Sequence, residues 1–80
     1  MQLRRVTIVK LANNVRRFRF ENNEMSQQEL ADHVGVTRMT IYSIEKGKYI
    51  PSTLIALKMA QLFNVSVEEL FYIQNENGGE

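Results

Sequence analysis

The sequence predicts an all-α fold, a compact domain of five helices preceded by a short N-terminal arm or strand. Two observations lead to this prediction. Apolar residues recur at helical spacing through most of the chain, and a Ser or Thr stands where four of the five helical segments would begin. Eighty residues are enough for one domain. Because the chain has no cysteine, its stability must come from a core of apolar side chains.

Residues 1–12 fit more than one structure. The run over residues 3–9 is rich in β-branched side chains and could form a strand. Apolar residues from Ile8 to Phe18 also fit helical spacing. We expect an arm or strand, which could pair with a partner chain or bring Arg4 and Arg5 to DNA. A disordered tail is the simpler alternative.

The first helix is expected over about residues 14–22. Val15 and Phe18 are three residues apart and would bury one face of it. Three arginines surround that face: Arg16, Arg17 and Arg19.

The second helix begins after Ser26, because Glu29 follows three residues later and completes a capping box. Leu30 and Val34 are four residues apart and share one helical face. Gly35 then ends this helix in a left-handed conformation that costs any other residue about 1 kcal/mol or more.

The third helix begins after Thr37, and Ile41 and Ile44 would pack its inner face against the second helix. Two helices joined by a glycine turn at this spacing form a helix-turn-helix. Its second helix commonly enters the major groove of DNA. A plain helical hairpin could also contain such a turn, but seven matched positions between Ser26 and Gly47 favour the DNA-binding motif.

Gly47 and Pro51 separate the third helix from a fourth, because proline cannot continue a helix. Ser52 caps this fourth helix, which is predicted over residues 53–63. Its inner face consists of Ile55, Ala56, Met59, Ala60 and Phe63.

Ser66 and Glu69 form a second capping box, which opens a short fifth helix that packs Leu70 and Phe71. The polar end of the chain, residues 74–80, is expected to be disordered. The predicted organisation is therefore an arm or strand over 1–12, a helix-turn-helix domain over 13–73, and this tail.

From Asn14 to Phe71 the sequence resembles the Cro and phage-repressor type of helix-turn-helix regulators, the xenobiotic-response-element family. The matching segments are SQQELA, GVT, IYSIEKG, KYIPS and VSVEELF. The chain departs from the family pattern in a longer segment before the motif, in Thr37 and in Asn64. The resemblance implies a repressor-like DNA-binding domain in which Arg19 pairs with Glu45.

Net charge is only +1, but its distribution is uneven. Residues 1–58 hold all ten Lys and Arg against five acids, whereas residues 59–80 hold four acids and no base. Because the basic part contains the helix-turn-helix, we expect that part to face the phosphates of DNA and the acidic end to face away.

On a helix with 100° per residue, the side opposite Ile41 and Ile44 presents Met39 and Lys46, and Arg38 stands at the leading end. Arg38 could hold guanine through two hydrogen bonds, and the alternative is a phosphate contact. The predicted base-reading residues are Arg38, Met39, Thr40, Tyr42 and Ser43. The predicted phosphate-binding residues are Gln27, by resemblance, with Lys46, Lys48 and Tyr49.

The sequence thus predicts a transcriptional regulator that binds double-stranded DNA sequence-specifically, as a homodimer on a near-palindromic operator. An antitoxin or adaptor of the same fold, bound to a toxin-like partner protein, is the alternative. An enzyme is not expected, nor a metal or cofactor, because no catalytic or ligand cluster is found, and the lone His33 suits a solvated surface. No signal peptide or membrane-length apolar run is seen, so we expect a cytoplasmic protein.

The homodimer is expected to use apolar residues that the helical core does not need: Leu54, Leu62, Tyr72 and Ile73. The resemblance places the contact between copies around the last two helices. The two reading helices would then lie about 34 Å apart, one turn of DNA. A rival arrangement joins the copies through strands at Arg5 to Val9. Leu54 and Leu62 could also simply cover the domain's own tail.

Overall fold

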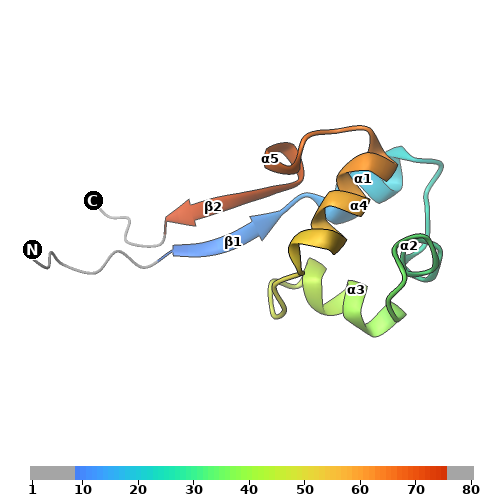
Figure 1. Cartoon of the computed structure of the whole chain (residues 1–80), viewed down its shortest axis with the longest axis horizontal. Coiled ribbons are helices and arrows are strands. Elements are labelled where there is room, and N and C mark those ends of the chain that lie inside the picture. Colours follow the sequence, from blue (N-terminus) through green and yellow to red (C-terminus); the bar gives the residue numbers. More distant parts are fainter. Residues whose placement is uncertain (1–8, 76–80) are drawn as a thin grey trace, which may run out of the picture.

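The computed structural model describes residues 9–75, which form a helical body with a two-stranded ribbon projecting from it (Figure 1). The elements follow in the order β1 (Val9–Asn13), α1 (Val15–Glu21), α2 (Gln27–Val34), α3 (Arg38–Glu45), α4 (Thr53–Phe63), α5 (Val67–Leu70) and β2 (Phe71–Asn75). The five predicted helices are present at the predicted places. None of the helices in residues 9–75 has both the length and the apolar character needed to span a membrane.

Both predicted capping boxes form. The Ser26 hydroxyl accepts the Glu29 backbone N–H at 3.0 Å, and the Glu29 carboxylate accepts the Ser26 N–H at 2.8 Å. Ser66 and Glu69 make the same pair of bonds before α5. The hydroxyls of two further residues, Thr37 and Ser52, cap α3 and α4. Caps of this kind each stabilise a helix by about 1 kcal/mol, which explains why the helix starts were predictable.

The turn between α2 and α3 has the predicted left-handed residue. Gly35 adopts φ 82°, and its N–H donates to the Ala31 carbonyl at 2.8 Å. A side chain at this position would be strained by the backbone conformation. The fully buried Ala31 lets the helices of the motif pack closely. The turn at Gly35 sets the angle at which α3 leaves α2.

One apolar cluster fills the space between the five helices. The rings of Phe18 in α1 and Phe63 in α4 stack with their centroids 6.0 Å apart. Ile55 and Ala56, predicted on the inner face of α4, are only partly buried against this cluster. The buried members are Val15, Phe18, Leu30, Ala31, Val34, Ile41, Ile44, Met59, Ala60, Phe63, Leu70 and Phe71.

The all-α prediction was incomplete, because β1 and β2 form an antiparallel two-stranded sheet. Leu11 pairs with Ile73 and Ala12 with Tyr72. Gln74 and Asn75, expected in the disordered tail, belong to β2. A strand becomes stable only beside a partner, and here the partner lies at the other end of the chain. Residues 1–8, with Arg4 and Arg5, and residues 76–80 lie outside the described range.

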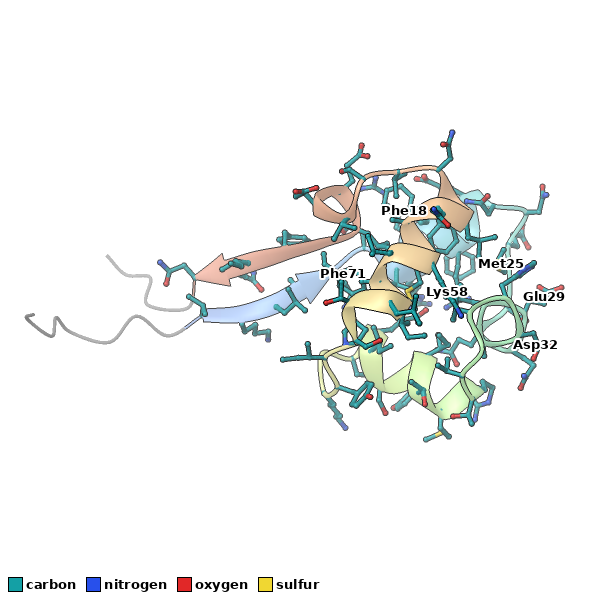
Figure 2. The ribbon with its side chains drawn as sticks, in the orientation of Figure 1. Phe18, Met25, Glu29, Asp32, Lys58 and Phe71 are labelled. Atoms are coloured by element: carbon teal, nitrogen blue, oxygen red, sulfur yellow. The ribbon has the colours of Figure 1, made fainter. Side chains whose placement is uncertain are left out.

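Two asparagines attach the ribbon to the helical body. The Asn13 side-chain amide donates to the Ile44 carbonyl in α3 at 2.9 Å, and that of Asn14 donates to the Glu69 carbonyl at 3.0 Å. The Asn14 backbone N–H also donates to the Leu70 carbonyl at 2.9 Å. Figure 2 shows Phe71 where β2 leaves the helices. The base of the ribbon is therefore fixed to α3 and α5.

Candidate nucleic-acid interface

The outer side of α3 carries the residues predicted to read DNA. Arg38 and Met39 are exposed, whereas Thr40, Tyr42 and Ser43 are half-buried. The residues predicted to bind phosphate also differ in exposure: Lys46, Lys48 and Tyr49 are exposed, and Gln27 is half-buried. Two hollows lie along this helix and separate these residues into two groups.

The first hollow, here called the α1–α3 groove, has a volume of about 400 Å³. Four cationic side chains and a single carboxylate line it, which makes it suited to an anion such as a phosphate. Its lining residues are Arg16, Arg19, Phe20, Gln27, Arg38, Tyr42, Glu45 and Lys46.

A chain of hydrogen bonds runs along the floor of the α1–α3 groove. Arg19 in α1 holds Glu45 in α3 through two bonds, Nε to Oε2 at 2.6 Å and the second guanidinium nitrogen to Oε1 at 3.1 Å. The Gln27 amide donates to the same Glu45 Oε1 at 3.1 Å. Arg38 in turn donates to the Gln27 Oε1 at 3.1 Å. The predicted Arg19–Glu45 pair is thus present, and it is linked through Gln27 to the first residue of α3.

The Arg19–Glu45 pair is buried, with 8% of each side chain exposed. A third partner supports Arg19, because its guanidinium also donates to the Met25 carbonyl at 2.7 Å. Every buried side-chain nitrogen and oxygen in residues 9–75 has a hydrogen-bond partner. Such a satisfied network holds α3 on α1 in one orientation.

Arg16 and Phe20 belong to this groove, although the sequence analysis did not select them. The two residues are four apart in α1, and the Arg16 guanidinium lies 5.4 Å from the centre of the Phe20 ring. Arg19 approaches the same ring at 5.4 Å. Their position beside Arg19, already expected to contact α3, was the signal that could have identified them.

The second hollow lies along the other side of α3, where the chain leaves the helix. It is more open than the α1–α3 groove, has a volume of about 320 Å³, and is lined by Met39, Thr40, Ser43, Lys48 and Tyr49. The Thr40 hydroxyl lies 3.0 Å from that of Thr37, so the helix cap already engages it. The predicted base-reading residues therefore divide: Arg38 and Tyr42 face the groove, and the other three face this hollow.

The two basic residues at the end of α3 also lie on different sides. Lys46 lines the α1–α3 groove, with its Nζ 5.8 Å from the centre of the Tyr42 ring. Lys48 lines the second hollow beside Tyr49. Both edges of the exposed surface of α3 therefore carry a positive charge, as binding between two phosphate strands requires.

The residues predicted to join two copies differ in exposure. Leu54 is 60% exposed, Tyr72 43% and Ile73 72%. Leu62 is half-buried and packs against the core. His33 is exposed, as expected. Within residues 9–75, no group of three or more His, Cys, Asp or Glu side chains is placed to hold a metal ion.

Comparison with known proteins identifies the family. The chain is 48% identical over 52 residues to YgzD of Bacillus subtilis. These 52 residues make up 65% of this chain and 79% of YgzD. The chain is 44% identical over 66 residues to an Archaeoglobus fulgidus protein, covering 82% and 92% of the two chains. It is also 39% identical over 66 residues to a Methanocaldococcus jannaschii protein, with coverage of 82% and 98%. All three relatives are described as uncharacterized helix-turn-helix-type transcriptional regulators.

The sequence profile of the helix-turn-helix family matches residues 16–70, which contain all five helices except the first residue of α1. This range includes α2 and α3, the turn at Gly35 and the whole lining of the α1–α3 groove. The resemblance inferred from the sequence is thereby confirmed, and the chain belongs to the helix-turn-helix family of Cro and repressor-type proteins.

Proposed function

We propose that this protein is a transcriptional regulator that reads the major groove of double-stranded DNA sequence-specifically. The observation that supports this most directly is the α1–α3 groove. There a basic surface flanks an exposed arginine at the leading end of α3, and hydrogen bonds hold that arginine in place. Family membership and the printed descriptions of the relatives support the same function.

Arg38 is the residue we expect to choose bases. The exposed Arg38 donates to the Gln27 Oε1 at 3.1 Å and to the Met39 Sδ at 3.5 Å, and these two bonds direct its guanidinium. Its remaining donors would reach the O6 and N7 atoms of guanine. Met39, 55% exposed, would cover a thymine methyl group. Ser43 and Thr40 offer hydroxyls to a base edge or a phosphate, and Tyr42 would support Arg38 from within the groove.

Phosphate contacts would surround this reading surface. We assign one DNA strand to the α1–α3 groove, where Arg16 and Lys46 supply charge beside Gln27. Lys48 and Tyr49 would hold the opposite strand from the second hollow. Contacts of this type determine affinity and register, whereas sequence choice stays with the base-reading side chains.

The regulator is proposed to act as a homodimer on a near-palindromic operator, in the cytoplasm. Exposed apolar side chains at Leu54, Tyr72 and Ile73 support a contact between copies. Leu62, predicted with them, could add only the part of its side chain that the core leaves uncovered. The expected separation of the two copies of α3 is about 34 Å.

An antitoxin or adaptor would offer the same apolar surface to a different protein. Purification from the native cell separates the two possibilities. A homodimer supports the regulator, whereas a stoichiometric second protein supports the adaptor.

The decisive experiment selects bound sequences from a pool of random DNA duplexes and then measures affinity for the selected site over a series of salt concentrations. Each phosphate contact should contribute about 0.9 to the slope of log affinity against log salt. Arg16→Ala should remove one phosphate contact and so lower that slope by about 0.9. Arg17→Ala is the matched control, because Arg17 is also exposed on α1 but pairs with Glu21 and lies outside the groove. A pool that yields no preferred sequence would refute sequence-specific reading.

A further inference from the structure

An exposed phenylalanine in the α1–α3 groove serves neither the core nor the reading of duplex DNA. Phe20 is 49% exposed and lies outside the apolar cluster that fills the helical body. A duplex presents phosphates and sugars to a groove beside the reading helix, because its bases are stacked inside the double helix. That backbone offers no partner to an aromatic ring, so Phe20 indicates a second ligand with a flat apolar face.

The two walls of the groove repeat one arrangement. In α1, Arg16 and Phe20 are four residues apart, and the guanidinium lies 5.4 Å from the ring centre. At the end of α3, Tyr42 and Lys46 are also four residues apart, and the ammonium lies 5.8 Å from the ring centre. Residues with this spacing share a helical face, so each wall presents one ring and one cation to the space between them.

The charge of the groove suits a chain of phosphates. Four cationic side chains and one carboxylate line it, which leaves three positive charges. Because the carboxylate, Glu45, is held by Arg19, the three remaining charges belong to Arg16, Arg38 and Lys46. All three side chains are exposed, and together they would bind a diphosphate or triphosphate more tightly than a single phosphate.

The groove has room for one nucleotide. Its volume of about 400 Å³ lies within the range of about 300–1,000 Å³ that small-molecule sites occupy. Arg19 is fixed by Glu45 and by the Met25 carbonyl, whereas Arg16 is exposed and can turn from the Phe20 ring to a phosphate. A single strand of nucleic acid stacks successive bases on several aromatic residues. One ring on each wall is enough for a single base.

We propose that the α1–α3 groove binds a free nucleotide that carries two or three phosphates. The base enters between Phe20 and Tyr42, and Arg16, Arg38 and Lys46 hold the phosphates. A DNA strand is assigned to the same groove, so the nucleotide and the operator exclude one another. The nucleotide therefore releases the protein from DNA, and this regulatory step rests on the proposed function.

Isothermal titration calorimetry of the full chain without DNA tests the site, with ATP, inorganic triphosphate and adenosine as probes. A base stacked on an aromatic side chain gains roughly tenfold in affinity, so ATP should bind about tenfold tighter than inorganic triphosphate of similar charge. Adenosine should bind at least about tenfold more weakly than ATP, because it lacks the groups that the three cations hold.

Variants separate the ring from the charges. Phe20→Ala should abolish the advantage of ATP over inorganic triphosphate and leave the affinity for triphosphate unchanged. The variant should remain folded because Phe20 lies outside the core, and circular dichroism checks this. Tyr49→Ala is the matched control, since it removes an exposed ring from the second hollow and should keep the full advantage. Arg16→Ala should weaken ATP and triphosphate by a similar factor, about fivefold.

Competition is measured by fluorescence anisotropy on the selected DNA site. With ATP at about nine times its own Kd, about one protein molecule in ten is free, so the apparent Kd for DNA should rise about tenfold. Inorganic triphosphate at the same concentration should raise it only about twofold, because its affinity is about tenfold lower. This comparison also corrects for the salt that the added anions contribute.

Equal affinities for ATP and inorganic triphosphate would overturn the proposal, as would an advantage of ATP that survives Phe20→Ala. A Phe20→Ala variant that loses affinity for a single-stranded oligonucleotide but not for ATP would assign the ring to nucleic acid instead. ATP binding that leaves the affinity for DNA unchanged would refute the exclusion.

The same measurements distinguish this proposal from the proposed function. If the DNA pool yields no preferred sequence while ATP keeps its advantage, the proposed function fails and the nucleotide site stands. If sequence-specific binding is found and ATP has no advantage, only the nucleotide site is wrong.

Discussion

Replacing Glu45 with alanine should remove a large part of the stability of this domain. The substitution leaves the Arg19 guanidinium buried, with 8% of its side chain exposed, and deletes two bonds from Arg19, of 2.6 and 3.1 Å, and one of 3.1 Å from Gln27. Breaking a buried pair by removing one partner costs about 3–5 kcal/mol. The total free energy of unfolding of a domain of this size is about 5–15 kcal/mol. The melting temperature should fall by about 12 °C or more, at about 4 °C for each kcal/mol.

Urea unfolding followed by circular dichroism gives the free energy of unfolding for each variant. The exposed pair between Arg17 and Glu21 is the control, because its side chains are 60% and 57% exposed and Arg17→Ala should cost less than about 1 kcal/mol. A double variant, Arg19→Met with Glu45→Leu, should recover most of the loss by leaving no buried charge. A loss below about 1 kcal/mol for Glu45→Ala would refute the reasoning.

Three further predictions concern DNA binding and assembly. Arg38→Ala should cost about 1–3 kcal/mol on the selected DNA site and much less on random duplexes in a fluorescence anisotropy titration. An equal loss on both would make Arg38 a phosphate contact. Lys46→Ala and Lys48→Ala should each weaken binding to all sequences alike and lower the salt slope by about 0.9, whereas an unchanged affinity would place them outside the footprint. Leu54→Glu should weaken the dimer without unfolding the chain, while Leu62→Glu should lower the urea midpoint because that side chain packs on the core. Sedimentation that shows an intact Leu54→Glu dimer would exclude α4 from the contact.

The helices were predictable because local chemistry specifies their ends. A hydroxyl at Ser26 or Ser66 followed three residues later by a glutamate satisfies backbone donors that no other nearby group can reach. Gly35 adopts a left-handed backbone conformation, which glycine enters without the steric cost that a side chain adds. These signals act within a few residues, so the sequence alone displays them.

The ribbon was not predictable in the same way. β2 pairs with residues at the other end of the chain, and nothing in its five residues identifies that partner. The exposure of individual side chains also depends on parts of the chain that are distant in the sequence. Leu54 and Leu62 are both leucines on one helix, but only the packing of neighbouring helices makes the first exposed and the second half-buried. The lining of the α1–α3 groove by Arg16 likewise depends on how α1 crosses α3.

The contacts around α3 explain how eight residues can act as a rigid reader. At its first residue, Arg38 is bonded to Gln27 of α2. Near its end, Glu45 is held by Arg19 of α1, and the Ile44 carbonyl accepts the Asn13 amide of β1. A helix this short is unstable alone, so its orientation comes from these neighbours. Discrimination between bases requires donors placed within a fraction of an ångström, and α3 obtains that precision from attachments to three separate elements.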